Sequence, residues 1–447
     1  MSNALANQSH TPIMRYAAPR SDIALIMASA ELLFANGQTT RRTVSEVERL
    51  AGALRVHATV VLRWGELVVR IADDARFYNE IVAVEPAGVD MSKVAATTGV
   101  IDEVCDGRLD CAAARSALKA VSRCPPVSLA RFASLAAAGA AALGVIFGAS
   151  HLLSLILIAF SAGAGAWVRR RLAGISRNPF VQPFCAALLA GIVGAVAARL
   201  QVSSALRLVA VCPCMVLVPG PHLLNGTIDL VRAHISLGAS RLLYAGVIIL
   251  MICTGLLVGL ALGGVSLPIS GPSSSVPLGY DVIAAGVAVA AYGTFFSMSW
   301  RRLPIPILIG MCAHALRWVV ITVAGASVQT GALVACLLVG TVMTPIANHL
   351  RLPFAAVAFA SVVSLIPGVY LFRMAGGLVA LAAPGGSTPP DLLVGVIADG
   401  STAALIIMAM TFGLIAPKMC MDHFWPNVTW PISRVAQGGQ AQSAPRS

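Results

Sequence analysis

The stretch that decides the fold is LVPGPHLL at residues 217–224, where a Pro-Gly pair interrupts a hydrophobic segment. The chain repeats it 148 positions later as LIPGVYLF, so that Pro367-Gly368 corresponds to Pro219-Gly220. Proline removes a backbone donor and glycine lets the chain turn, so each pair predicts a break in a helix. In lipid, such a break is tolerated only where the freed backbone groups are buried in protein or line a water-filled cavity.

Two further repeated segments precede these pairs in the sequence. LLAGIV at 188–193 recurs as LLVGTV at 337–342, and GVIF at 144–147 recurs as GTFF at 293–296, both at a shift of 149. Three matches near one offset predict a duplicated unit. Interruptions at corresponding positions of two halves are the usual pointer to the central site of a transporter.

The composition indicates a membrane protein. Hydrophobic residues make up 57% of the 447 residues, charged residues only 11%, and the mean hydropathy is +0.83. Residues 132–447 hold sixteen basic and five acidic residues, so the net charge of +12 belongs almost entirely to the apolar part. We therefore read the charge as an effect of loops flanking a membrane and expect no nucleic-acid partner.

The polarity of the chain predicts five regions. Pro125-Pro126 separates a mixed N-terminal part, with strand-like runs around Trp64-Gly65, from the apolar remainder. We expect a mainly α membrane protein with a small cytoplasmic α/β domain. The predicted regions are a disordered N-terminus (1–20), the cytoplasmic domain (21–125), a first five-helix membrane repeat (126–265), a second five-helix repeat (280–418) and a cytoplasmic tail (419–447).

Ten apolar stretches are each near the roughly 20 residues that cross a bilayer. We place them at about 129–148, 151–168, 181–198, 206–224, 242–264, 280–298, 304–324, 329–347, 352–372 and 392–416.

With the N-terminal domain in the cytoplasm, the basic residues favour one side. The predicted inner loops and tail carry Arg169, Arg170, Arg171, Arg177, Arg232, Arg241, Arg301, Arg302, Arg351, Lys418, Arg434 and Arg446, and the outer loops carry Arg199, Arg207 and Arg373. This agrees with the positive-inside rule. Because five crossings is an odd number, the second repeat enters from the opposite side, which predicts inverted repeats suited to alternating access.

The two Pro-Gly pairs are the first candidates for a substrate site. The N-terminal ends of half-helices attract a carboxylate and freed carbonyls attract an ammonium, so an amino acid suits them. The alternative is a pair of structural kinks. After the first pair, Asn225 and Asp229 lie four apart on one helix face. We assign Asn225 to substrate binding and Asp229 and His222 to gating, with polar residues at a membrane exit as the alternative.

The seventh stretch contains His314 and Arg317. An arginine at this depth is costly unless it faces a cavity or a partner. Arg317 is therefore a candidate for binding the carboxylate of a substrate, with an ion pair to an acid that locks a helix as the alternative. His314 is a candidate proton carrier, or else a hydrogen-bonded packing residue. Among the acids, Asp399 is the candidate for proton coupling, with a helix cap in the headgroup layer as the alternative. Asp281, directly after a polar loop, is expected to be such a cap.

No enzyme or cofactor motif emerges. The sequence has no nucleotide-binding glycine loop, no His-Glu-x-x-His and no Cys-x-x-Cys, so we expect neither an enzyme nor a metal nor another cofactor. Transport should then be secondary, with a small-molecule substrate, protons and the lipid bilayer as partners. The sequence is compatible with a homo-oligomer.

The chain resembles the threonine/serine exporter family. The resemblance rests on LLFANGQTTRRT at 32–43, on the Pro219-Gly220 segment running to Asp229, and on the Pro367-Gly368 segment, and it covers about residues 21–418. It implies export of L-threonine and L-serine across the inner membrane, driven by the proton-motive force. A branch of the same family exports dicarboxylates such as succinate, which stays an alternative, and so does a membrane sensor with a cytoplasmic effector domain.

Overall fold

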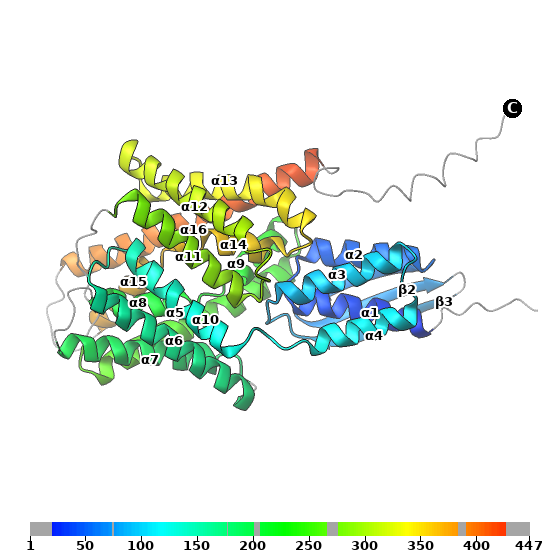
Figure 1. Ribbon diagram of the computed structural model, residues 1–447, viewed down its shortest axis with the longest axis horizontal. Helices are drawn as coiled ribbons and strands as arrows, with labels where there is room; N and C mark the ends of the chain where they lie inside the picture. The colour runs from blue at the N-terminus through cyan, green and yellow to red at the C-terminus, as the bar shows by residue number, and fades with distance from the viewer. Residues whose placement is uncertain are drawn as a thin grey trace, which may run out of the picture.

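The computed structural model describes residues 20–73, 76–176, 178–200, 206–265, 276–382 and 390–425. Two parts lie side by side along the long axis of the molecule (Figure 1). We call residues 20–123 the N-terminal unit and residues 129–424 the helical unit. The region predicted to be a disordered N-terminus and most of the predicted tail lie outside the described residues, while the last helix continues past 418 to Phe424.

The N-terminal unit combines a three-stranded antiparallel sheet with four helices. Its elements are α1 (Arg20–Ala35), α2 (Thr40–Ala53), β1 (His57–Arg63), β2 (Gly65–Asp73), β3 (Arg76–Val84), α3 (Met91–Cys105) and α4 (Cys111–Arg123). Helices α1 and α2 pack on the sheet, and α3 and α4 pack on these helices. Gly37 has φ +87° after α1, and Gly65 has φ +90° at the β1–β2 turn, where Arg63 pairs with Glu66. Both positions favour glycine. The strand-like runs predicted around Trp64-Gly65 form the antiparallel hairpin of β1 and β2, and the sheet has a third strand, β3, that the sequence did not indicate.

The core of the N-terminal unit follows directly from its sequence pattern. Alternate residues of β2, among them Leu67, Val69 and Ile71, are buried against the helices. Helix α2 buries positions spaced by three and four residues, including Val47 and Leu50. These are the periods of a half-covered strand and of an amphipathic helix.

The helical unit consists of two halves with the same order of elements. The first contains α5 (Leu129–Ile146), α6 (Leu152–Ile175), α7 (Val181–Arg199), α8 (Leu206–Met215), α9 (Gly220–Val231) and α10 (Ile235–Leu262). The second contains α11 (Leu278–Phe295), α12 (Pro304–Trp318) with the π-turn η1 (Val319–Val323), α13 (Val328–His349), α14 (Phe354–Val362) with the 3₁₀ turn η2 (Val363–Leu365), α15 (Gly368–Ala382) and α16 (Pro390–Phe424).

The two predicted helix breaks are present. Helices α8 and α9 meet at 54°, and the segment Phe354–Leu365 meets α15 at 67°. Within the described residues, eight helices are long and apolar enough to cross a membrane, or ten when each bent pair counts as one span. The mainly helical fold is confirmed. The inverted relation of the halves stays a prediction.

Close helix contacts recur at equivalent glycines of the two halves. A Cβ on Gly191 of α7 would lie 2.4 Å from the carbonyl oxygen of Leu256 in α10. At the position 149 residues later, a Cβ on Gly340 of α13 would lie 2.6 Å from the carbonyl oxygen of Gly413 in α16. Small residues let helix backbones approach closely where apolar burial gives no net drive between helices in lipid. The LLAGIV echo thus marks one packing contact used in both halves.

Candidate functional site

The two helix breaks pack against each other at the centre of the helical unit. A Cβ on Gly220, which begins α9, would lie 1.7 Å from ring atoms of Phe359 in α14. A Cβ on Gly368, which begins α15, would lie 2.7 Å from Cγ of Met215 at the end of α8. Each half-helix after a break therefore starts against the half-helix before the other break. The four broken segments form one crossing at the centre of the helical unit.

A tyrosine satisfies a carbonyl at the first break. Tyr292 of α11 donates its hydroxyl hydrogen to the carbonyl oxygen of Met215 at 2.5 Å, in a fully buried position. The last carbonyls of a helix have no partner within the helix, and such a group is costly to bury alone. The ring of Tyr292 also packs edge-on against Phe359. The pair Tyr292 and Phe359 thus closes the centre of the crossing.

A cavity of about 430 Å³ opens on the side of the crossing away from the N-terminal unit, and we call it the distal cavity. It lies beside the second break, and it falls in the usual range for small-molecule pockets of about 300–1,000 Å³. Its polar and charged lining comes from α11, α12, η1, η2 and α15. The lining includes Asp281, Arg317, Trp318, Thr322, Ser364, Pro367, Tyr370 and Arg373.

Three buried side chains form a hydrogen-bonded chain at this cavity. His314 Nδ1 lies 2.9 Å from Asp281 Oδ2, and its Nε2 lies 2.5 Å from the hydroxyl of Ser364. A carboxylate only accepts, so Nδ1–H donates to Asp281 and neutral His314 accepts from Ser364 at Nε2. Protonated His314 donates to both neighbours, which frees the Ser364 hydroxyl hydrogen for another acceptor. The expectation that Asp281 caps a helix in the headgroup layer is wrong. Asp281 does lie in the first turn of α11, but it is buried against His314.

The two arginines of the distal cavity differ in their partners. Arg373 Nε lies 2.9 Å from Asp399 Oδ2, so the predicted proton carrier Asp399 sits in an ion pair behind the cavity wall. Among the described residues, Arg317 has no carboxylate within 4.0 Å. The distal cavity therefore offers one guanidinium to an incoming anion, together with the carboxylate of Asp281.

A second cavity, of about 420 Å³, lies beside the first break and next to the N-terminal unit, and we call it the proximal cavity. Residues 87–89 of the N-terminal unit form part of its wall. The remaining lining residues include Phe132, Arg169, Gln182, Val218, Pro219, His222, Tyr244 and Phe295. The predicted site residues thus divide between two cavities, with Pro219 and His222 in one and Arg317 and Pro367 in the other.

The N-terminal unit holds α9. His222 Nε2–H donates to the carbonyl of Ala87 at 3.2 Å, and Asn225 Nδ2 donates to the carbonyl of Gly37 at 3.2 Å. The amide oxygen of Asn225 is buried without a hydrogen-bond partner among the described residues. These contacts place both side chains between α9 and the N-terminal unit. A substrate role for Asn225 and a gating role for His222 stay predictions.

Asp229 sits in a buried ion pair. Its Oδ2 lies 3.1 Å from Nη1 of Arg241 in α10, and each side chain is 2% exposed. His234 approaches the other carboxylate oxygen at 3.9 Å. A pair so deeply buried costs several kcal/mol when one partner is removed, because the other charge stays behind. The pair therefore locks α9 to α10.

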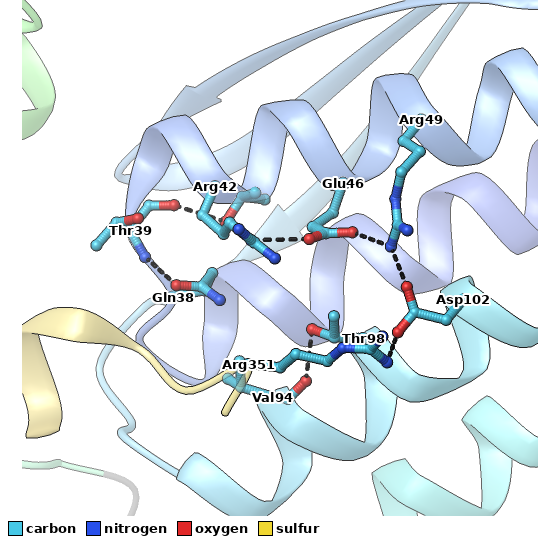
Figure 2. Close-up of polar contacts among 10 residues, drawn as sticks. Gln38, Thr39, Arg42, Glu46, Arg49, Val94, Thr98, Asp102 and Arg351 are labelled. Carbon is cyan, nitrogen blue, oxygen red and sulfur yellow. Dashed lines mark hydrogen bonds and ion pairs between the residues drawn. The ribbon is translucent and has the colours of Figure 1, made fainter. Parts of the chain in front are cut away.

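Ion pairs also connect the N-terminal unit to the loop between α13 and α14. Figure 2 shows the chain that runs from Arg42 through Glu46, Arg49 and Asp102 to Arg351. The Arg42–Glu46 contact is 2.7 Å and the Arg49–Asp102 contact is 2.6 Å.

A second set of ion pairs converges on Asp422 at the end of α16. Arg232 lies 2.7 Å, Lys418 3.4 Å and Arg41 3.5 Å from its Oδ2. The N-terminal unit is thus tied to both halves near the first break.

The chemistry available is that of binding and proton transfer. No group of three metal-ligating side chains occurs in the part of the chain that the structure describes. The sequence analysis missed Ser364 because a lone serine in an apolar run gives no signal. It also missed Arg169 as a cavity residue, because it ended the second apolar stretch at 168, whereas α6 continues to Ile175.

Comparison with protein families gives two matches that together span most of the chain. One threonine/serine exporter family model matches residues 24–263, and a second matches residues 281–420. No solved structure matches the chain.

Proposed function

The chain belongs to the threonine/serine exporter family, and we propose that it exports small hydroxy amino acids, L-threonine and L-serine, from the cytoplasm by secondary transport. The family and the apolar helices make it a multi-pass membrane transporter. We further propose that the proton-motive force drives this export, that two inverted repeats give alternating access, and that the protein lies in the inner membrane with both termini in the cytoplasm.

One observation carries the choice of substrate. The distal cavity combines Arg317, which has no carboxylate within 4.0 Å among the described residues, with the buried carboxylate of Asp281. A zwitterionic amino acid presents the matching pair of charges. Its carboxylate would pair with the planar guanidinium of Arg317, a geometry that favours two parallel hydrogen bonds. Its ammonium would approach Asp281, and its hydroxyl would reach Ser364.

The same groups suggest how protons drive export. With His314 neutral, the Asp281–His314 pair carries one negative charge, which attracts the ammonium of the substrate. After His314 takes up one proton, the pair is neutral and the attraction falls. Proton and substrate thus compete for one pair, and a proton entering from the outside favours release there. In this proposal His314 carries the proton, as predicted from the sequence, and Asp281 is its partner. Asp399, the other predicted proton carrier, forms an ion pair with Arg373.

The placement of the two cavities supports alternating access. Each lies beside one break, and the contacts of Gly220 with Phe359 and of Gly368 with Met215 separate them. With the N-terminal unit in the cytoplasm, the proximal cavity faces inward and the distal cavity faces outward. An exchange of packing at the crossing would then open one cavity and close the other.

A dicarboxylate is the second candidate. Arg373 lines the same cavity as Arg317, so two guanidinium groups are within reach of a ligand that bears two carboxylates. Arg373 is already neutralised by Asp399, however, and a succinate-like ligand would have to displace that carboxylate. The geometry therefore favours the amino acid.

Flux from proteoliposomes tests the function. Vesicles preloaded with threonine, serine, alanine or succinate should release threonine and serine faster when the outside is acidic. Asp281→Asn should abolish this acceleration, whereas Asp391→Asn, at an exposed acid in α16, should leave it unchanged. Release of succinate in preference to threonine would reject the proposed substrate. Equal release with and without the pH gradient would reject proton coupling.

A further inference from the structure

The two cavities are lined by residues at equivalent positions of the two halves. Pro219 and His222 line the proximal cavity, and the residues 148 positions later, Pro367 and Tyr370, line the distal cavity. These residues flank the two breaks, so their correspondence follows the duplicated Pro-Gly motif.

The correspondence extends to helices far from the motif. Phe147, directly after α5, lines the distal cavity, and Phe296, 149 positions later and directly after α11, lines the proximal cavity. The first half thus contributes to the cavity of the second break and the second half to the cavity of the first. Reciprocal exchange of this kind is what a twofold relation between the halves requires.

The second helix of each half also carries an arginine that lines a cavity. Arg317 of α12 lines the distal cavity, and Arg169 of α6 lines the proximal cavity. The distal and proximal cavities have similar volumes, about 430 and 420 Å³. Each cavity therefore contains a guanidinium from the second helix of one half.

The surroundings of Arg169 do not neutralise it. Its Nε is buried and has no hydrogen-bond partner among the described residues. Its guanidinium carbon lies 4.7 Å from the centre of the Phe295 ring, and no carboxylate of the described residues lies within 4.0 Å. A charged group at such a place is expensive unless it serves a ligand or lines a wet cavity. Its neighbours on α6 are occupied differently, since Arg170 donates to the carbonyl of Val127 and Arg171 stacks on Trp167.

We propose that Arg169 is a second carboxylate-binding residue, which holds the substrate in the proximal cavity before it passes to Arg317. The proposal rests on the proposed function and deepens it by adding a binding site on the side of the N-terminal unit. The ligand class is a small molecule with one free carboxylate. Tyr244 and His222 line the same wall and pack edge-to-face with ring centres 5.2 Å apart, so they offer polar atoms beside an aromatic face.

The two sites differ in their acidic groups. The lining of the distal cavity contains Asp281, whereas the described lining of the proximal cavity contains no aspartate or glutamate. The titratable His222 lines the proximal cavity, and Asp90 lines a neighbouring cavity that Arg169 also borders. Competition between proton and substrate for the Asp281–His314 pair would therefore act at the distal cavity.

The test measures substrate affinity from each face separately. Proteoliposomes carry wild type, Arg169→Gln, Arg317→Gln or the control Arg171→Gln, and protease cleavage of the N-terminal unit reports the orientation. Exchange of labelled threonine is measured with one face saturated and the other titrated. Arg169→Gln should raise the half-saturation concentration at the face of the N-terminal unit by about tenfold or more, as expected for a lost charge-assisted hydrogen bond. The half-saturation concentration at the other face should change by less than about twofold. Arg317→Gln should raise the half-saturation concentration at the other face and leave that at the face of the N-terminal unit nearly unchanged.

Three results would overturn or separate the claims. A half-saturation concentration at the N-terminal face that is the same in Arg169→Gln and Arg171→Gln would overturn the role of Arg169. If wild type exchanges succinate but not threonine, the proposed substrate fails, while a side-specific shift for succinate would still support Arg169. If Arg169→Gln does not fold, Arg169→Lys decides, because it keeps the charge but loses the planar fork. A rise of about threefold or more at that face supports the proposal, and no change overturns it.

Discussion

Replacing Gly220 by alanine tests how tightly the two breaks fit. The added methyl would lie 1.7 Å from the Phe359 ring, whereas carbon atoms in favourable contact are about 3.5–4.0 Å apart. The ring or α9 must therefore move by about 2 Å. Overpacking of a core costs about 1–3 kcal/mol, and a clash with a rigid ring belongs at the upper end. We expect Gly220→Ala to lower the free energy of unfolding by about 2–3 kcal/mol.

The second break offers a milder version of the same change. A methyl on Gly368 would lie 2.7 Å from Cγ of Met215, and a flexible methionine can adapt where a ring cannot. Gly368→Ala should therefore cost less than Gly220→Ala. Gly246 in α10 is the control, because a Cβ there meets nothing within 4 Å. Gly246→Ala should be neutral or stabilising by up to about 1 kcal/mol, since alanine favours helix more than glycine does.

Unfolding in detergent micelles, followed by tryptophan fluorescence during titration with a denaturing detergent, gives the comparison. Phe359→Leu makes room at the ring, so Gly220→Ala should cost at least about 1 kcal/mol less in that background than in wild type. Equal stabilities of Gly220→Ala and Gly246→Ala, or no difference between the two backgrounds, would refute the packing that we describe.

Two further perturbations probe the connection of α9 and α10 to their surroundings. Asp229→Asn leaves Arg241 buried without its carboxylate, so it should lower the free energy of unfolding by about 3–5 kcal/mol. Glu66→Gln, in an exposed pair, should lower it by less than about 1 kcal/mol in the same unfolding titration. Similar losses in the two variants would show that burial of the Asp229 pair is unimportant. The Trp64 ring of the N-terminal unit packs on the Tyr244 ring of α10, with ring centres 4.8 Å apart. Trp64→Ala should therefore loosen the N-terminal unit and speed its release by limited proteolysis. An unchanged cleavage rate would contradict this docking contact.

The sequence predicted the breaks and the order of helices because their signals are local. A Pro-Gly pair in an apolar run leaves few alternatives to a break, and the 148-residue shift repeats it. Strand β3 was missed because its residues 76–84, RFYNEIVAV, mix charged and apolar side chains and follow no turn signal as clear as Trp64-Gly65. Its pairing with β2 depends on a neighbour that only the folded chain supplies.

The site was only partly predictable, because its contacts join residues that are distant in the sequence. Asp281 and His314 are 33 residues apart, and His314 and Ser364 are 50 apart. Asp281 follows a polar loop in the sequence, which indicated that its carboxylate is solvated. The packing of α11 against α12 buries this carboxylate instead. Arg169 belongs to a run of three arginines, which is typical of a loop at the membrane surface, yet the packing of α6 brings the first of them to a cavity.

The measurement that tests the account most directly is the accessibility of one engineered cysteine in each cavity. Val218→Cys and Ile366→Cys occupy positions 148 residues apart, line the proximal and distal cavities respectively, and can be placed in a variant whose native cysteines are replaced. A membrane-impermeant thiol reagent should label position 218 only from the face of the N-terminal unit and position 366 only from the opposite face, and a substrate that increases one rate should decrease the other. Labelling of both positions from the same face, or rates that rise together, would contradict two cavities that open in turn.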